Sequence, residues 1–150
     1  MTTGAWILLA AVVLVAAFGT WRAVADGRFS VRRRTAAQPE EVVEVPVTAQ
    51  VVAAVGGELG ARATLLQFSS AFCAPCKVTR RTLAEVAELV DGVSHVEVDA
   101  EQHLEMTRAL GVLRTPTTLV LDPSGHESSR AQGAPKRDQV LAAVAGVQAS

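Results

Sequence analysis

The stretch Phe68–Leu83, FSSAFCAPCKVTRRTL, contains both cysteines of this 150-residue chain. Cys73 and Cys76 are separated by two residues, Ala74 and Pro75. Two cysteines at this spacing have three interpretations: half of a metal site, a structural disulfide, or a reversible redox pair. The residues around the pair, and then the rest of the chain, distinguish these interpretations.

The cysteine pair lies where a predicted strand gives way to a predicted helix. Residues 63–70, ATLLQFSS, form an apolar run of strand length. Residues 73–90 carry apolar side chains at helical spacing, and Asp91 and Gly92 predict the end of that helix. The sequence therefore places the pair in the first turn of a helix that follows a buried strand.

The first turn of a helix suits a reactive thiol at Cys73. Its backbone N–H groups lack partners and carry partial positive charge, so they stabilise a thiolate and lower the thiol pKa. The thiolate is the attacking species in disulfide exchange. Cys76 lies one turn further on, where it can reach Cys73 and resolve a mixed disulfide. Pro75 suits a helix start because no N–H partner is needed there.

The other two interpretations have less support. A structural zinc site needs four ligands, and the three histidines lack the usual H-x3–5-H spacing: His95, His103 and His126. A permanent disulfide that closes so short a loop would constrain the unfolded chain little. We therefore favour a redox pair and expect no metal and no bound cofactor.

The remaining patterns predict an α/β domain. Glu40–Val45 alternates weakly and could form a first edge strand. Residues 48–56 predict a short helix with Thr48 as its N-cap. The other expected elements are a strand over 93–99, a helix over 100–111, strands over 117–122 and 128–131, and a helix over 135–144. This order predicts a βαβ unit followed by a hairpin and a helix, hence a mixed sheet with helices on both faces.

The N-terminal segment has a different character. Gly4–Trp21, GAWILLAAVVLVAAFGTW, has no charged residue, and about 20 apolar residues are enough to cross a bilayer as a helix. Trp6 and Trp21 flank the run, as aromatic residues do at membrane interfaces. We therefore predict a transmembrane helix over residues 1–25, with a buried core helix as the alternative.

Charge after this run predicts the side of the membrane. Five arginines lie between Arg22 and Arg34, and none precedes the run, so residues 26–47 are expected to form a basic juxtamembrane linker. The positive-inside rule then places the rest of the chain in the cytoplasm. The alternatives are an outward-facing anchor and a cleaved signal peptide that ends near Ala23–Ala25. The net charge of −1 gives no reason to expect nucleic acid as a partner.

The segments FSSAFCAPCKVTRRTL, VEVDA, RTPTTLVLDPSG and AQGAP, in this order, resemble the thioredoxin family over residues 48–147. The resemblance implies a thioredoxin-like fold in which a mixed central sheet is flanked by helices. It also implies that Cys73 is the nucleophile, that Cys76 is the resolving thiol, and that Pro116 is a cis-proline beside them. The backbone of Thr115 would then pair with bound substrate, and Gly133 would leave room for it.

The chain departs from the family pattern at several positions. Phe72 and Ala74 replace a common tryptophan and glycine, which alters the surface that meets partners. Gln67 replaces a buried aspartate that helps to deprotonate the resolving thiol, and an amide cannot take up a proton. His95 corresponds to a lysine that commonly neighbours that aspartate. We hypothesise that His95 supplies the missing base, because imidazole titrates near neutrality; the alternative is a solvated strand histidine.

These observations predict a membrane-tethered thiol–disulfide oxidoreductase that reduces protein disulfides. Its expected partners are disulfide-containing proteins and a thioredoxin reductase or other dithiol donor. If the domain faces outward, the same site would serve apocytochrome reduction or disulfide formation. A non-catalytic binding module of the same fold is a further alternative, whereas a peroxidase is disfavoured because it usually has a single peroxidatic cysteine in another context.

Overall fold

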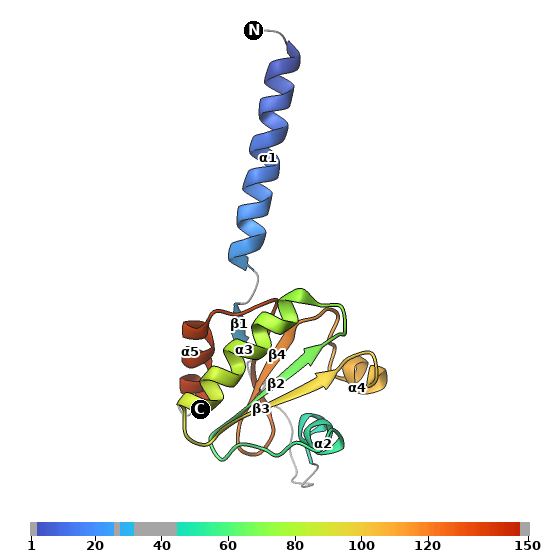
Figure 1. Ribbon diagram of the computed structural model, residues 1–150, viewed down its shortest axis with the longest axis vertical. Coiled ribbons are helices and arrows are strands. Elements are labelled where there is room, and N and C mark those ends of the chain that lie inside the picture. Colours follow the sequence, from blue (N-terminus) through green and yellow to red (C-terminus); the bar gives the residue numbers. More distant parts are fainter. Residues whose placement is uncertain (1–2, 26–27, 32–44, 148–150) are drawn as a thin grey trace, which may run out of the picture.

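The computed structural model describes residues 3–25, 28–31 and 45–147 of the chain. Within these residues one sheet has the strand order β1-β5-β4-β2-β3. Figure 1 shows helices packed around this sheet and one long helix that extends away from it. The elements are α1 (Thr3–Ala25), β1 (Phe29–Val31), α2 (Val47–Ala54), β2 (Ala63–Ser69), α3 (Ala74–Leu89), β3 (Val93–Asp99), α4 (Leu104–Ala109), β4 (Thr117–Leu121), β5 (Glu127–Gln132) and α5 (Arg137–Val147).

The sheet is mixed, as the sequence predicts. β2 and β3 are parallel and are joined through α3, which makes the expected βαβ unit. β4 runs antiparallel to β2, and β5 runs antiparallel to β4 as the second strand of a hairpin. β2 therefore has a neighbour on each side, and all seven of its residues are buried.

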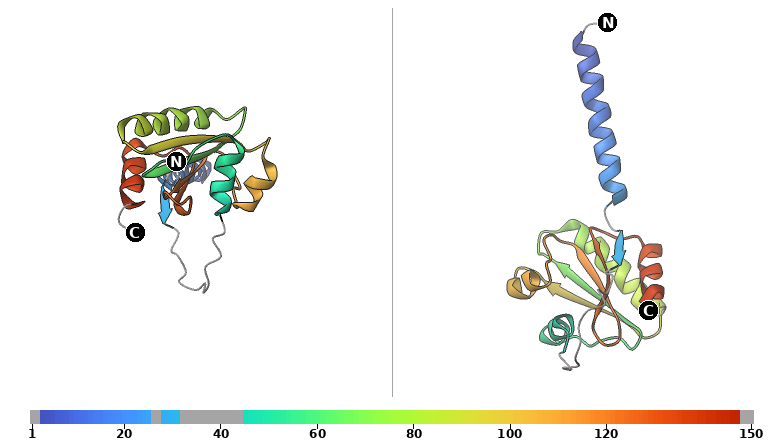
Figure 2. Two further views of the ribbon diagram at one scale, coloured as in Figure 1. Left: turned by 90° about the horizontal axis from the view of Figure 1, so that it is seen from below. Right: turned by 180° about the vertical axis from the view of Figure 1, so that it is seen from behind.

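Two apolar cores lie on opposite faces of the sheet, and Figure 2 shows helices on both of these faces. Successive side chains of a strand point to opposite faces, so Leu65 and Leu66 belong to different cores. Leu65 packs with Leu83 of α3 and Val140 of α5. Leu66 packs with the core that includes Val51 of α2 and Met106 of α4. This arrangement confirms the prediction of helices on both faces.

Two predicted helices begin differently in the structure. α2 is preceded by Pro46, and Thr48 is not its N-cap: the buried Thr48 hydroxyl donates a hydrogen bond to the carbonyl of Gly125. α4 has six residues and begins four residues later than predicted. The Asp99 carboxylate accepts the backbone N–H groups of Glu101 and Gln102, which holds a turn where the helix was expected.

The edge strand beside β5 comes from a segment with no strand signal in the sequence. β1 is three residues long, pairs antiparallel with β5, and lies within the range 26–47 that the sequence predicts as a linker. The strand predicted over Glu40–Val45 falls outside the described residues, except for Val45, which is not in a strand.

The N-terminal segment forms α1, which projects from the sheet domain in Figure 1. Its side chains from Trp6 to Trp21 are all exposed. Among the residues that the structure describes, no helix has both the length and the apolar character needed to cross a membrane. Of the transmembrane helix predicted over residues 1–25, residues 3–25 are observed as a helix, but this helix is not supported as a membrane span.

Candidate functional site

Cys73 and Cys76 form a disulfide at the start of α3, where β2 has just ended. The two sulfur atoms are 2.02 Å apart, and the Cα atoms are 5.2 Å apart. Cys73 is the N-cap residue of α3, and its Sγ accepts a hydrogen bond of 3.1 Å from the backbone N–H of Cys76. Pro75 lies in the first turn, where its missing N–H leaves no partner unsatisfied. Strand and helix thus place the pair where the sequence predicts it.

The two cysteines differ in exposure. Cys73 is half-buried, whereas only 2% of Cys76 is exposed. An incoming disulfide can therefore approach Cys73, while Cys76 is shielded beneath the first turn of the helix. The positive end of α3 lies at Cys73, so a thiolate formed there upon reduction is stabilised.

A second loop lies against the cysteine loop. The peptide bond between Thr115 and Pro116 is cis, as the family resemblance implies. The hydroxyl oxygens of Ser70 and Thr115 are 3.1 Å apart and share a hydrogen bond. The carbonyl of Pro116 accepts a hydrogen bond of 2.8 Å from the N–H of Gly133, whose φ of +88° lies in the region that glycine favours. The structure thus places the loop of Thr115 and Pro116 next to the cysteine loop, and Gly133 next to Pro116.

Two large apolar side chains are exposed on these loops. Phe72, directly before the first cysteine, is 100% exposed. Leu113, two residues before Thr115, is 90% exposed. Phe72 was predicted from the sequence as a residue that contacts partners, but Leu113 was not. An apolar residue just before the Thr115–Pro116 pair could have indicated Leu113. Both are placed to contact an apolar partner surface.

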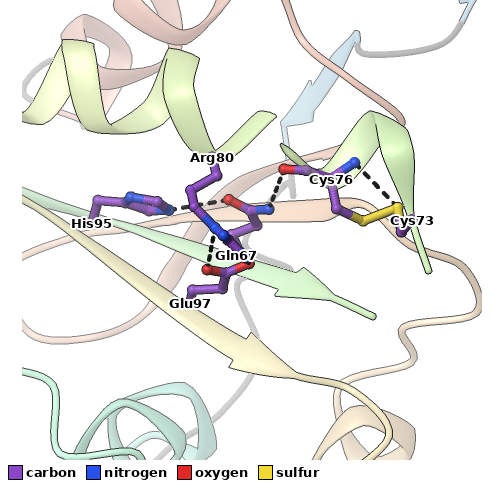
Figure 3. A network of polar contacts seen from close by, with 6 residues as sticks. All are labelled: Gln67, Cys73, Cys76, Arg80, His95 and Glu97. Atoms are coloured by element: carbon purple, nitrogen blue, oxygen red, sulfur yellow. Dashed lines mark hydrogen bonds and ion pairs between the residues drawn. A yellow bond between two sulfur atoms is a disulfide. The ribbon is translucent and has the colours of Figure 1, made fainter. Parts of the chain in front are cut away.

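A buried polar chain runs behind the second cysteine (Figure 3). Gln67 of β2 is completely buried, and its Nε2 donates a hydrogen bond of 3.1 Å to the carbonyl of Cys76. Its Oε1 lies 3.1 Å from Nε2 of His95 on β3. The structure therefore brings together Gln67 and His95, which the sequence analysis singled out, and links both to Cys76.

An ion pair lies next to this chain. Arg80 of α3 contacts Glu97 of β3 through two nitrogens, Nη2 at 2.7 Å and Nε at 2.6 Å. Burial raises the pKa of Glu97, but hydrogen bonds from Arg80 and Ser69 and the charge of Arg80 outweigh burial and leave the pKa below its usual value. No local pattern predicts this pair, because Arg80 and Glu97 meet only when α3 packs on β3.

Burial has the largest effect on the pKa of His95. It lowers the pKa of the imidazole below its usual value, because the protonated form loses hydration. The carboxylate of Glu97 acts in the opposite direction, and the guanidinium of Arg80 adds to the lowering. A half-buried imidazole with a depressed pKa is mostly neutral at pH 7.

A pocket of about 270 Å³ opens beside the disulfide. Its walls include Lys77 and Arg80 on α3, and Glu97 and Asp99 on β3. The apolar residues Phe72 and Leu113 are not part of this polar lining. Among the described residues, no group of three or more His, Cys, Asp or Glu side chains is placed to hold a metal ion.

The fold and this site define a class of protein: an α/β domain with a CxxC disulfide at a helix start and a cis-proline loop beside it. The family model for thioredoxin matches residues 51–146. The chain belongs to the thioredoxin family.

Individual relatives agree with this assignment. Thioredoxin H2-1 of rice (Oryza sativa subsp. japonica) is 31% identical over 116 residues, which cover 73% of this chain and 83% of the relative. The thioredoxin of Mycoplasma genitalium is 26% identical over 77 residues, or 51% of this chain and 74% of the relative.

Solved structures show the same fold. A chloroplastic thioredoxin z superposes with a TM-score of 0.57 at 22% identity, covering 67% of this chain and 89% of its own. Thioredoxin f from spinach chloroplast has a TM-score of 0.53 at 24% identity, with coverage of 66% and 83%. In a thioredoxin-family domain, a close pair such as Cys73–Cys76 indicates thiol–disulfide oxidoreductase activity.

Proposed function

We propose that this protein reduces disulfides in other proteins through Cys73 and Cys76. The observation that carries the proposal is the unequal exposure of a close cysteine pair at the start of α3. A half-buried cysteine at the positive end of a helix can attack a disulfide, and a buried cysteine one turn away can resolve the mixed disulfide. A structural disulfide would need neither property.

The reaction balances without a bound cofactor. In the reduced protein, the Cys73 thiolate attacks one sulfur of the substrate disulfide, so a Cys73–substrate bond forms and the second substrate sulfur leaves as a thiolate. Cys76 then gives up its proton to solvent, and its thiolate attacks Sγ of Cys73, which re-forms the Cys73–Cys76 disulfide and releases the first substrate sulfur as a thiolate. Two electrons pass from the cysteine pair to the substrate, and the two substrate thiolates take up protons. A dithiol donor, such as a thioredoxin reductase, then restores the reduced pair.

The surface around Cys73 favours polypeptide substrates. Phe72 and Leu113 offer exposed apolar contacts on two adjoining loops. The family resemblance assigns the backbone of Thr115 to pairing with an extended substrate segment, and the hydrogen bond between Ser70 and Thr115 holds that backbone next to the cysteine loop. Apolar contacts combined with backbone pairing suit an extended chain better than a small molecule.

We also propose that α1 attaches the domain to a membrane, with the sheet domain on the cytoplasmic side. What supports attachment is the surface of α1: from Trp6 to Trp21 every side chain is exposed, and all are apolar except Gly19 and Thr20. The hydroxyl of Thr20 is bonded within the helix to the carbonyl of Ala16, so it needs no water. The arginines that follow the run support the cytoplasmic side.

The redox proposal is tested by an insulin-reduction assay. The full-length chain is assayed in mild detergent, with dithiothreitol as the electron donor. We expect activity in the natural chain and none in Cys73→Ser. Cys76→Ser should trap a mixed disulfide with the substrate, because Cys73 can still attack. His126→Ala, an exposed change in the turn between β4 and β5, is the matched control and should leave the rate unchanged. A natural chain no more active than Cys73→Ser would instead favour a non-catalytic binding module.

Membrane attachment has its own test. After cell lysis, we expect the full-length chain to sediment with membranes and to resist washing at high pH. Complete release by that wash would overturn the attachment proposal. The side of the membrane is then determined with two C-terminal fusions. One is to a fluorescent protein that matures only inside the cell, and the other is to a phosphatase that is active only outside. Phosphatase activity without fluorescence would refute the cytoplasmic orientation and move the chemistry to the outer face.

A further inference from the structure

The amide of Gln67 has one possible orientation between its two neighbours. The carbonyl oxygen of Cys76 can only accept a hydrogen bond, so the group that faces it at 3.1 Å must be the NH₂ of the amide. The Oε1 atom then faces His95, and this oxygen can also only accept. Nε2 of His95 must therefore carry a hydrogen and donate it.

Both hydrogen bonds thus point in the same direction, from His95 through Gln67 to Cys76. An amide at this position neither takes up nor gives up a proton. His95 therefore cannot withdraw a proton from Cys76 through Gln67, and in the neutral ring only Nδ1 remains free to be protonated. The hypothesis that His95 replaces the missing base has no route along this chain of bonds.

We propose that His95 is a positioning residue that tunes the cysteine pair through orientation and charge. Its Nε2–H holds Gln67, and Gln67 holds the carbonyl of Cys76 in the first turn of α3. Protonation of the ring at Nδ1 places a positive charge on the side chain that is linked through Gln67 to Cys76. This charge favours the thiolate form of the cysteine pair in the reduced protein. The proposal rests on the proposed redox function, because only a pair that cycles between disulfide and dithiol has such a thiolate.

Two charged groups near the imidazole ring of His95 affect its protonation. Glu97 on the same strand and Arg80 on α3 affect its pKa in opposite directions, and they pair with each other. Gln67, the contact from β2, carries no charge. Because the two charges act against each other, burial dominates and depresses the pKa of His95. The ring therefore gains its proton at a lower pH than a solvated histidine does.

Thermodynamic linkage makes the proposal measurable. If a positive His95 favours a thiolate, a thiolate must equally favour a positive His95. The pKa of His95 should therefore rise when the disulfide is reduced. The side chain of Gln67 separates the ring from Cys76, so the expected rise is small, about 0.5 unit.

The first measurement is an NMR titration of the histidine ring signals of the full-length chain in detergent micelles, oxidised and after chemical reduction. The signals are assigned by the single changes His95→Gln, His103→Gln and His126→Gln. We expect the pKa of His95 to rise by about 0.5 unit upon reduction. Equal His95 pKa values in the two states would overturn the charge-sensing part of the proposal.

The second measurement separates positioning from proton transfer. His95→Gln retains an N–H donor but cannot titrate, whereas His95→Leu has neither property. At pH 8, where natural His95 is neutral, we expect His95→Gln to reduce insulin within twofold of the natural rate. We expect His95→Leu to be several-fold slower and to accumulate the Cys73 mixed disulfide. Equal impairment of both variants would mean that His95 acts as a base, which would overturn the positioning role.

These outcomes remain separate from the proposed function. The cysteine pair can be reduced chemically, so the titration works even if the natural chain fails to reduce insulin. An inactive chain with an unchanged His95 pKa would refute both proposals. An active chain with an unchanged His95 pKa would refute only the charge-sensing role.

Discussion

Ser70 and Thr115 share a hydrogen bond of 3.1 Å between their hydroxyl oxygens, although they lie 45 residues apart in the chain. The first residue precedes the cysteine loop, and the second precedes the cis-proline. This contact connects the two loops that would meet a substrate. We expect it to set their spacing, since Ser70 and Thr115 are both half-buried and the bond is partly protected from water.

The contribution of this bond can be measured with a double-mutant cycle of Ser70→Ala and Thr115→Val. Each change should lower the free energy of unfolding by about 1 kcal/mol, the usual net contribution of one hydrogen bond. The double variant should lose less than the sum of the two, because the bond is already absent in either single variant. Urea unfolding of the oxidised protein measures all four values. Strict additivity would show that the two hydroxyls do not stabilise each other.

Among the polar residues of the sheet, we expect substitution of Gln67 to lower the free energy of unfolding the most. Its side chain is completely buried and makes bonds at both ends of the amide. Gln67→Leu keeps most of the volume but leaves those partners unbonded, which should cost about 1–3 kcal/mol. Gln67→Ala should cost about 1–2 kcal/mol more because it also leaves a cavity. Thermal unfolding that ranks Gln67→Ala above Gln67→Leu in stability would contradict this account.

His95 should make the stability of the oxidised protein depend on pH. Its pKa is lowered in the folded state, so around pH 6 the unfolded chain binds more protons at this residue than the folded chain does. The His95 contribution therefore decreases as the pH falls from the unfolded pKa of about 6.5 through the lower folded pKa. We expect the natural chain to lose more stability than His95→Gln between pH 7 and pH 5. Parallel curves from urea unfolding would show that the folded pKa is not depressed.

The pair between Arg80 and Glu97 should contribute little to stability despite its two short contacts. The Arg80 side chain is 54% exposed, so water and salt screen the interaction. A double-mutant cycle with Arg80→Ala and Glu97→Ala should give a coupling of about 0.2–1 kcal/mol, decreasing at high salt. The matched comparison is Arg130 with Glu127, where the side chains are only 20% and 6% exposed. Stronger coupling at Arg80–Glu97 than at Arg130–Glu127 would refute burial as the deciding factor.

Phe72 and Leu113 should affect substrate binding more than stability. Both side chains are almost fully exposed, so Phe72→Ser and Leu113→Ser should each change the free energy of unfolding by less than about 0.5 kcal/mol. Each should raise KM for a protein disulfide by about 3–10-fold, which corresponds to about 1 kcal/mol of lost apolar contact. Leu89→Ser, an exposed change at the other end of α3, is the control. An unchanged KM in both loop variants would show that substrates do not contact this surface.

Local sequence patterns were sufficient to predict most of the strands and helices. The strand over 93–99 has the predicted bounds, because a short alternating run between turn residues leaves few other structures. The strand before the cysteines was predictable from its continuous apolar run, and the helix after them from apolar side chains at helical spacing. β1 was not predictable, because three residues carry no periodicity and their partner strand lies about a hundred residues further along the chain. The turn that shortens α4 depends on one side chain, Asp99, whose bonds override helix propensity.

The sequence by itself determined the reactive pair and its setting: two thiols one turn apart, after a buried strand and at the start of a helix. Those features depend on neighbouring residues, whose geometry is set by covalent spacing and hydrogen bonding within one turn. Only the tertiary structure decided what surrounds the pair. Parallel pairing of β2 with β3 brings His95 to Gln67, and packing of α3 on β3 brings Arg80 to Glu97. These contacts join residues 17 to 28 positions apart, which meet only once the sheet has assembled and its helices are packed.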